Sequence, residues 1–267
     1  MHVCRIVKRR LMNTGLPKSI KVGHGGTLDP LASGLLVVLI GKATRLCDVI
    51  MAGEKEYSAT IDLEHFSASC DLETRPEPVA ISQVPSRENV DAILEKFTGN
   101  VLQRPPIYSA MWIDGQRAYD LARKGRDVEM VERTIFIRSI AIEDFNWPTL
   151  RIHIVCGKGT YIRSLARDIG VALGTGGVLT QLRRTRIGMM RIEDAVHLDE
   201  MSDPLPVASL RAIPQEFAHL VVPGISTPAG STQRIRQLDG CSGPVDPIIE
   251  NRNSCDIAND DDSGHEQ

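Results

Sequence analysis

The sequence predicts an α+β fold, because two kinds of hydrophobic periodicity occur in separate stretches of the chain. Residues 57–63 alternate apolar and polar side chains, which is typical of a strand with one buried face. Residues 87–98 instead repeat their apolar side chains at the spacing of one helical face. Strands and helices do not alternate regularly along the chain, so a repeating βαβ architecture is disfavoured.

The other elements follow from the same patterns, taken in chain order. Ser86 is the expected N-cap of the helix at 87–98, because a serine hydroxyl accepts a hydrogen bond from a free backbone N–H group. Asp114-Gly115 is a tight-turn pair and predicts a β-hairpin. The remaining predictions are a helix at 3–11, a buried strand at 35–40, strands at 109–113, 133–142 and 151–156, and a helix at about 160–173.

The C-terminal part of the chain has a different composition. After about residue 205 the periodicity fails, and Pro, Gly, Ser and Asp accumulate. We expect residues 205–267 to be poorly structured and to end in a disordered acidic tail at 259–267, since such sequences bury too little apolar surface to fold.

Composition excludes several classes of protein. No apolar run is long enough to span a membrane. The six cysteines lie far apart without a C-x-x-C pair, which predicts reduced thiols in the cytoplasm and no metal site. The net charge of −3 conceals a basic segment, because residues 151–191 contain eight Lys and Arg residues and one acid. This segment is a candidate nucleic-acid contact, although such segments are often only solvated faces.

A glycine-rich segment at 21–35 holds the strongest candidate for a chemical role. Its glycines permit a tight loop, and it carries His24 and Asp29. Pro30 biases Asp29 toward an extended backbone, and the apolar run that follows supplies a rigid support. From the residues alone, Asp29 is either a nucleophile or a turn residue whose carboxylate accepts a backbone N–H group. Both interpretations remain open at this point.

The same segment resembles a known family. Gly23-His-Gly-Gly-Thr-Leu-Asp-Pro-Leu-Ala-Ser-Gly34 is similar to the signature of TruB-type tRNA pseudouridine synthases, in which the aspartate is the catalytic residue. Further motifs follow in the family's order, and together they cover about residues 3–200. They are Gly41-Lys-Ala-Thr-Arg45, Lys55-Glu-Tyr57, Gln103-Arg-Pro-Pro-Ile-Tyr-Ser-Ala110, Gly115-Gln-Arg-Ala-Tyr119, Ala122-Arg-Lys-Gly125, Gly157-Lys-Gly-Thr-Tyr-Ile-Arg-Ser-Leu165 and Leu182-Arg-Arg-Thr-Arg-Ile-Gly188.

The resemblance implies a pseudouridine synthase fold with a mixed, largely antiparallel central sheet and flanking helices. It implies an isomerase, without cofactor or metal, that converts the T-loop uridine at tRNA position 55 to pseudouridine by base flipping. The implied partner is the T-arm of tRNA, with no membrane and no obligatory protein partner, and we expect a cytoplasmic monomer. Residues 1–160 would form the N-terminal catalytic region and residues 161–204 its C-terminal part, without a recognisable PUA domain after it.

The resemblance also implies catalytic roles. Asp29 would attack the flipped uridine nucleotide, so that the base detaches, rotates and rejoins through carbon. Tyr57 would stack on that base and assist the final deprotonation. Arg163 would pair with Asp29 and favour its charged form, because an opposite charge stabilises a carboxylate.

RNA-binding roles complete the predicted site. By the same resemblance, Tyr161 and Leu182 would line the uracil pocket, and His24 would fill the gap that the extruded base leaves. The basic segment would supply Lys158, Arg183 and Arg184 as RNA contacts. The two adjacent arginines are expected to act mainly through phosphates.

The sequence departs from the family's pattern at several points. The family usually begins with a strand and a Lys-Pro loop that precede the first residue here, so either the start is misassigned or an edge strand is missing. Ser67-Ala-Ser-Cys-Asp71 retains only the second acid of a run that usually has two, and Trp112 replaces a usual lysine. Two other functions therefore stay open: a guide-RNA-directed relative that modifies ribosomal RNA, and an inactive RNA-binding or tRNA-folding protein.

Overall fold

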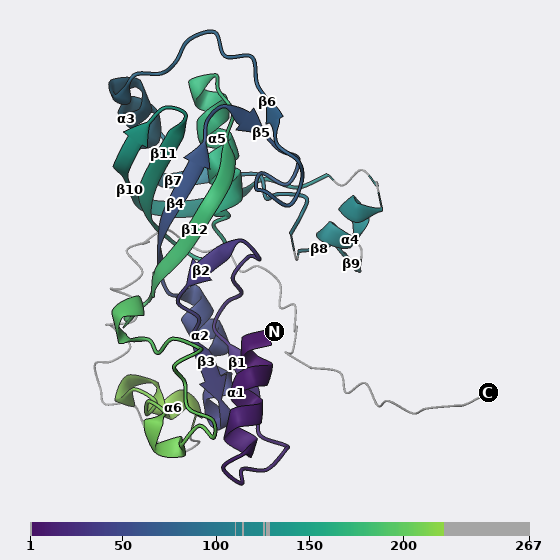
Figure 1. Ribbon diagram of the computed structural model, residues 1–267, viewed down its shortest axis with the longest axis vertical. Helices are drawn as coiled ribbons and strands as arrows, with labels where there is room; N and C mark the ends of the chain where they lie inside the picture. Colours follow the sequence, from purple (N-terminus) through teal and green to yellow (C-terminus); the bar gives the residue numbers. More distant parts are fainter. Residues whose placement is uncertain (1, 110, 114, 125, 127–128, 222–267) are drawn as a thin grey trace, which may run out of the picture. The chain divides into compact units, whose positions relative to one another are not determined.

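The largest sheet of the described part of the chain is mixed and has seven strands (Figure 1). The computed structural model describes residues 2–109, 111–113, 115–124, 126 and 129–221. β2 is parallel to β12, and all other neighbours in the sheet are antiparallel, which confirms the expected mixed, largely antiparallel sheet. In spatial order the strands are β13 (Met190–Arg191), β12 (Val178–Ile187), β4 (Lys55–Asp62), β11 (Thr149–Cys156), β10 (Arg133–Asn146) and β7 (Gly99–Gln103), with β2 (Ala32–Gly34) beside β12.

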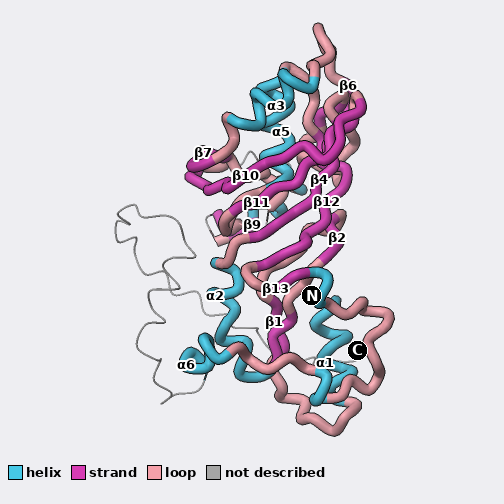
Figure 2. The backbone as a smooth tube through the Cα atoms, turned by 90° about the vertical axis from the view of Figure 1, so that its left-hand side faces the viewer, coloured by secondary structure: helices cyan, strands magenta, loops and turns pink. Residues whose placement is uncertain are grey.

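Two helices, α3 (Arg87–Glu95) and α5 (Ile162–Leu173), pack on this sheet. α5 packs on β12, α3 packs on β10, and the two helices contact each other. Figure 2 shows the strands from β7 to β2 side by side, with both helices next to them. Alternate residues of the strands point into the core, because side chains along a strand alternate between two faces. The fully buried side chains of this core include Ile61, Ile152, Ile154, Leu165 and Ile169.

Helix α3 begins where the sequence predicts. Asn89 N donates a hydrogen bond to Ser86 Oγ at 3.3 Å, and Ser86 N donates one to Asn89 Oδ1 at 3.2 Å. This reciprocal capping satisfies two N–H groups that have no partner within the helix, and it confirms Ser86 as the N-cap. The helix ends at Glu95 rather than at residue 98, and residues 96–98 continue as tighter turns.

Residues 2–52 contain a smaller group of elements besides β2. The predicted helix at 3–11 is confirmed as α1. Of the predicted strand at 35–40, only residues 38–40 form one, since Leu35 N donates to Arg184 O of the central sheet instead. The elements of this group are α1 (His2–Met12), β1 (Val22–His24), its antiparallel partner β3 (Val38–Ile40), the 3₁₀ helix η1 (Gly41–Leu46) and α2 (Cys47–Ala52).

Most other predicted elements are present with small shifts in their ends, but among the described residues of the predicted strand at 109–113 only Trp112–Ile113 form one. The strands at 133–142 and 151–156 and the helix at about 160–173 are confirmed as β10, β11 and α5. β8 and β9 pair antiparallel as expected of a hairpin, whose turn residue Asp114 lies outside the described residues. The short elements of the chain are β5 (His65–Phe66), β6 (Glu77–Pro78), β8 (Trp112–Ile113), β9 (Gln116–Arg117) and α4 (Ala118–Arg123).

The chain after residue 205 corrects one expectation. Residues 205–221 are not poorly structured: Leu205 packs against Val7 and Leu11 of α1, and Val221 is buried against η1 and α2. Leu205 and Val221 are buried against elements distant in the sequence, which local periodicity does not detect. The short helices here are η2 (Ile192–Asp194), η3 (Val207–Ser209), η4 (Gln215–Phe217) and α6 (Ala218–Val221). Residues 222–267, including the expected acidic tail, lie outside the described residues.

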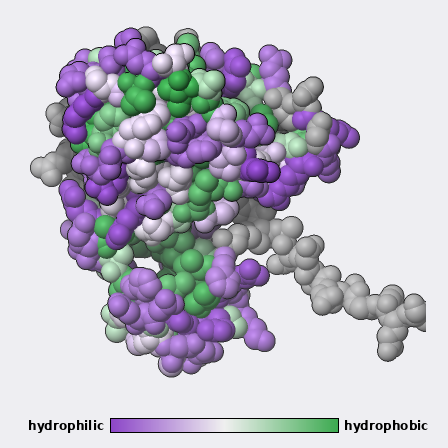
Figure 3. All heavy atoms as spheres, turned by 45° about the horizontal axis from the view of Figure 1, so that its top comes forward, coloured by the Kyte–Doolittle hydropathy of each residue, from purple (hydrophilic) through white to green (hydrophobic). Residues whose placement is uncertain are grey.

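Polar and apolar side chains are interspersed over the face of the molecule that Figure 3 shows. Large exposed apolar residues occur on several elements, among them Leu102 on β7, Trp112 on β8 and Val171 on α5. Such scattered residues are normal on a protein surface. Among the described residues, no helix is long and apolar enough to cross a membrane.

Candidate active site

The glycine-rich segment forms a loop between β1 and β2, and this loop carries Asp29. Gly25 is buried, and a Cβ atom there would lie 2.2 Å from Ile50 Cγ2, so a larger residue would displace Ile50. Gly25 N donates to Val37 O at 2.8 Å, and Ala32 N donates to Asp29 O at 2.9 Å. The loop is therefore held by its own packing on both sides of Asp29.

The far end of the loop joins the central sheet. β2 pairs in parallel register with Leu182–Arg184 of β12. Gly34 adopts a φ of +102°, and a Cβ atom there would lie 2.2 Å from Arg184 O. Only glycine permits both this backbone conformation and this approach. The close pairing places the Asp29 loop at a fixed position on the sheet that also contains Tyr57.

Asp29 forms an ion pair with Arg163, as the resemblance implies. Arg163 Nε donates to Asp29 Oδ2 at 2.8 Å, and Arg163 Nη1 donates to Tyr108 O at 2.8 Å. The Arg163 side chain is only 5% exposed, whereas that of Asp29 is 34% exposed. A buried cation thus orients a carboxylate that remains accessible to a ligand.

Asp71 is a member of the site that sequence reasoning did not assign. Its side chain is 4% exposed, and Asp71 Oδ2 lies 3.5 Å from Arg163 Nη1. Its other oxygen, Oδ1, accepts a hydrogen bond from Glu73 N at 2.9 Å. Arg163 therefore lies between two carboxylates, one buried and one accessible. The signal was present in the sequence, since Asp71 is the acid that remains in the altered run at 67–71.

Tyr57 lies on β4 and packs, partly buried, against the core cluster of the sheet. Burial raises the pKa of its phenol to about 12; the charge of Arg184 and a side-chain hydrogen bond with it act against this rise. The negative charge of Asp29 also raises this pKa, which places the two predicted catalytic residues within electrostatic reach of each other. Tyr57 is therefore a neutral phenol near pH 7.

Leu182 and Tyr161 lie on the two elements that flank the site. Leu182 of β12 is 6% exposed and belongs to the same core cluster against which Tyr57 packs. Tyr161 is the N-cap residue of α5, and its backbone forms two hydrogen bonds with the buried side chain of Gln103, at 2.9 and 3.1 Å. The guanidinium of Arg133 lies 5.0 Å from the centre of the Tyr161 ring, a cation–π distance.

His24 ends β1 and begins the loop. Burial lowers the pKa of its imidazole, and the positive charge of Arg184 acts in the same direction. Its buried Nδ1 has no hydrogen-bond partner among the residues that the structure describes. A neutral, half-buried imidazole at this position is compatible with the predicted packing role against RNA.

The three cations predicted to contact RNA divide into two groups. Lys158 and Arg183 are exposed, as a phosphate contact requires. Arg184 is 2% exposed and donates to three backbone carbonyls of the Asp29 loop and its end, so the prediction that it contacts phosphates is wrong. The reason is the alternation of side chains along β12, which places adjacent arginines on opposite faces of the sheet.

Comparison with known proteins identifies the family of the chain that carries this site. The family model described as TruB family pseudouridylate synthase (N terminal domain) matches residues 9–162, which contain Asp29 and Tyr57. The chain belongs to the TruB family. A second family model, described as tRNA pseudouridylate synthase B C-terminal domain, matches residues 163–223, which begin with Arg163.

Similar proteins of the TruB family come from several bacteria. The protein named tRNA pseudouridine synthase B from Phocaeicola vulgatus is 43% identical over 215 residues, which are 80% of this chain and 88% of the relative. Its namesake from Bacteroides fragilis is 45% identical over 195 residues, which are 73% of this chain and 80% of the relative.

Solved structures similar to this TruB-family chain include a protein complex and an RNA–protein particle. One is a Cbf5-Nop10-Gar1 complex, with 30% identity and a TM-score of 0.51 over 70% of this chain and 45% of that chain. Another is an H/ACA RNP bound to a substrate RNA containing 2′-deoxyuridine, with 28% identity and a TM-score of 0.53 over 75% of this chain and 47% of that chain.

Lys55 is a further buried cation of the TruB-family site, two residues before Tyr57 on β4. It is 8% exposed, and its Nζ donates to Met51 O. Burial lowers the pKa of this amine to about 8, and the positive charges of Arg184 and Lys158 act in the same direction. Sequence reasoning quoted Lys55 in a motif but did not assign it a role.

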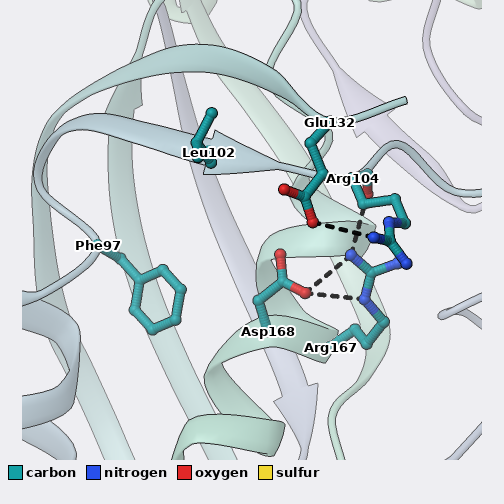
Figure 4. A pocket seen from close by; sticks show the side chains of 6 residues that line it. All are labelled: Phe97, Leu102, Arg104, Glu132, Arg167 and Asp168. Atoms are coloured by element: carbon teal, nitrogen blue, oxygen red, sulfur yellow. Dashed lines mark hydrogen bonds and ion pairs between the residues drawn. The ribbon is translucent and has the colours of Figure 1, made fainter. Parts of the chain in front are cut away.

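A groove beside α5 lies apart from the Asp29 loop and has a volume of about 440 Å³ (Figure 4). Its charged side chains pair with one another: Arg104 with Glu132 at 3.1 Å, and Arg167 with Asp168 at 2.8 Å. Arg167 Nη2 also donates to Arg104 O at 2.9 Å. In these ion pairs each charge of the groove is balanced by a neighbouring side chain. The charged residues therefore hold the local structure together and are not available to bind a ligand. Across the described part of the chain, no cluster of His, Cys, Asp or Glu has the arrangement of a metal site.

Proposed function

We propose that this chain isomerises uridine to pseudouridine in tRNA, at position 55 of the T loop. The observation that carries the proposal is the Asp29–Arg163 ion pair, in which a buried guanidinium orients a partly exposed carboxylate on a rigid loop. Membership of the TruB family supports the reaction, and relatives named tRNA pseudouridine synthase B, at 43% and 45% identity, support tRNA as the substrate.

The reaction requires a nucleophile and no change in redox state. The uridine leaves the base stack, and the carboxylate of Asp29 attacks the nucleotide. The N1–C1′ bond breaks, the base rotates, and a C5–C1′ bond forms. The proton on C5 is then lost and N1 gains one, so the product is an isomer of the substrate. Asp29 is released at the end of the cycle, and no cofactor is consumed.

Tyr57 and Arg163 support Asp29 in different ways. Because Tyr57 stays a neutral phenol near pH 7, stacking on the flipped base is the role that we assign to its ring. A phenol in this state is a poor base, so deprotonation of C5 would have to involve another acceptor, such as the carboxylate of Asp29. Arg163 keeps that carboxylate oriented toward the base and stabilises its charge.

The binding surface would combine two exposed cations with side chains around the loop that are buried or half-buried in the free protein. We assign phosphate contacts to Lys158 and Arg183, contacts with the uracil to Tyr161 and Leu182, and packing in the vacated base position to His24. The enzyme would act as a cytoplasmic monomer without a protein partner. The identity to relatives named tRNA pseudouridine synthase B is higher than the identity to chains of the Cbf5-Nop10-Gar1 complex and the H/ACA RNP, which favours tRNA as the substrate.

Replacement of the nucleophile tests the proposal. Asp29→Asn preserves size and removes the attacking charge, so pseudouridine formation on a T-arm hairpin should vanish while the hairpin still binds. The matched control is Asp48→Asn, which makes the same change at an exposed residue of α2 and should turn over like the wild type. Turnover of Asp29→Asn above about a tenth of the wild-type value would sink the assignment, because loss of a nucleophile normally costs several kcal/mol of barrier.

A further inference from the structure

We infer that Arg184 is a positioning residue, whose guanidinium fixes the Asp29 loop relative to Tyr57 during the isomerisation. The inference rests on the proposed function for its catalytic meaning. The claim that Arg184 holds the Asp29 loop in place does not depend on that function.

The guanidinium of Arg184 joins the two ends of the loop. Nη2 donates to Gly26 O at 3.0 Å and Nη1 donates to Thr27 O at 3.2 Å, three and two residues before Asp29. Nε donates to Leu35 O at 2.9 Å, beyond the other end of the loop. One planar side chain therefore connects the segment that enters the loop with the segment that leaves it.

The backbone of Arg184 supports the same region. Leu35 N donates to Arg184 O at 2.8 Å, and Gly34 is the parallel partner of Arg184 in the β2–β12 ladder. Both the side chain and the main chain of one residue thus bind the Asp29 loop. Arg184 is in addition the residue whose charge and hydrogen bond act on the phenol of Tyr57. It contacts both predicted catalytic elements without being exposed to substrate.

The burial of Arg184 excludes a direct contact with RNA. Arg184 is 2% exposed. Its sequence neighbour Arg183 is exposed on the opposite face of β12. The guanidinium of Arg184 donates to three backbone carbonyls and also hydrogen-bonds the phenol of Tyr57, and it forms no ion pair with a carboxylate among the described residues. A buried arginine with three fixed carbonyl acceptors needs a fork of donors in one plane, which lysine does not provide.

Arg186 offers a matched control on the same strand. It is also largely buried, with 14% of its side chain exposed, and it donates to Glu56 at 2.6 Å, to Glu54 at 2.5 Å and to Gly188 O at 2.7 Å. None of these groups belongs to the Asp29 loop. Loss of Arg186 should therefore lower stability without moving the loop, which separates a positioning effect from general destabilisation.

The experiment compares Arg184→Met, Arg184→Lys and Arg186→Met in the full chain. Single-turnover rates on a T-arm hairpin at saturating enzyme report the chemical step, and titration of the hairpin reports affinity. Hydrogen exchange of the peptide covering residues 22–37, measured without RNA, reports how firmly the loop is held. Melting temperatures set a working temperature at which all the proteins are folded.

The positioning role predicts a specific pattern. Arg184→Met should lower the single-turnover rate about 100-fold, the effect of a misplacement of about 1 Å, and leave the dissociation constant within about 3-fold. Arg184→Lys should lose less, because an ammonium reaches some of the carbonyls but not all three. Exchange at residues 22–37 should accelerate in both Arg184 variants and stay at the wild-type rate in Arg186→Met.

Several results would overturn the inference. These are an Arg184→Met rate within about 3-fold of wild type, a loss confined to affinity, or an equal loss of rate in Arg186→Met. If Arg184→Met does not fold, Arg184→Lys carries the same comparison. A wild-type protein that leaves the T-loop uridine unchanged would refute the proposed function instead, and exchange at residues 22–37 would still test the role of Arg184.

Discussion

The buried and the exposed cations of this protein differ in what they bind, although the sequence places them in the same basic segment. Arg163 and Arg184 are 5% and 2% exposed, and their partners are a carboxylate pair and backbone carbonyls. Lys158 and Arg183 point into solvent. A count of charges treats all four as equivalent. Strand and helix periodicity determine which cations are buried. A buried cation binds groups of the protein and holds the site in place, whereas an exposed cation is available to contact the substrate.

The two groups also differ in energetic consequence. A buried charge that loses its partner remains desolvated, which typically costs 3–5 kcal/mol, whereas an exposed cation that loses a contact returns to water. Changes at the buried group should therefore alter stability and the chemical step. Changes at the exposed group should alter only binding and its dependence on salt.

The largest expected effect is at Arg163. Arg163→Met removes the partner of Asp29 and leaves Asp71 buried without its cation, so unfolding free energy should fall by about 3–5 kcal/mol. The single-turnover rate should fall by roughly 100-fold or more, because the nucleophile loses its orientation. Denaturant titration and single-turnover kinetics on a T-arm hairpin measure the two effects separately.

A double variant distinguishes the two effects of Arg163. Arg163→Met combined with Asp71→Asn removes the unpaired buried charge, so most of the stability should return. The rate should stay low, because Asp29 still lacks its partner. If the double variant recovered the rate together with the stability, Arg163 would be a structural residue. The claim that the buried cations support the chemical step would then be wrong for Arg163.

An intermediate effect is expected at Lys55, a buried cation that forms no ion pair with a carboxylate among the described residues. Its pKa falls from 10.5 to about 8 in the folded protein. Between about pH 8 and pH 10.5 the unfolded chain therefore binds more protons, so this lysine makes stability rise with pH. Below about pH 8 its penalty is complete.

The test is the pH dependence of Lys55→Met relative to the wild type. Between pH 8 and pH 10, denaturant titrations should show the wild type gaining about 1–3 kcal/mol relative to the variant. Parallel curves for the two proteins over this range would mean that Lys55 is solvated in the native state.

The smallest effect is expected at Arg183. Arg183→Ala should weaken hairpin binding a few-fold and reduce the slope of log affinity against log salt by about one, the value of one lost phosphate contact. The loss should be similar for all T-arm sequences. An unchanged salt slope would remove Arg183 from the binding surface.

The sequence predicts the sheet well because its strands have the alternation that one buried face requires. Residues 57–63 and 151–156 became β4 and β11 for this reason. The pairing of Asp29 with Arg163 came from the resemblance rather than from periodicity, since the two residues are 134 positions apart.

What the sequence does not predict depends on contacts between distant segments. The packing of residues 205–221 has no periodicity of its own, because single apolar residues there contact α1, η1 and α2. The role of Arg184 was missed because two adjacent arginines suggest one shared function. The alternation of β12 was available in the sequence, and it would have placed Arg184 on the same face as the buried Leu182.

The position of Leu205 has a consequence for how the protein is made. Leu205 packs on Val7 and Leu11, and its N–H group donates to Arg10 O, while Arg9 pairs with Asp203, 194 positions later. At a synthesis rate of about 5–20 residues per second, the apolar face of α1 waits roughly 10–40 s on the ribosome for this partner. Val22, Val38 and Ile40 pack in the same cluster and emerge earlier, so during that time the apolar face of α1 is covered only in part. Early binding of a chaperone to α1 would protect this face until residues 203–205 emerge.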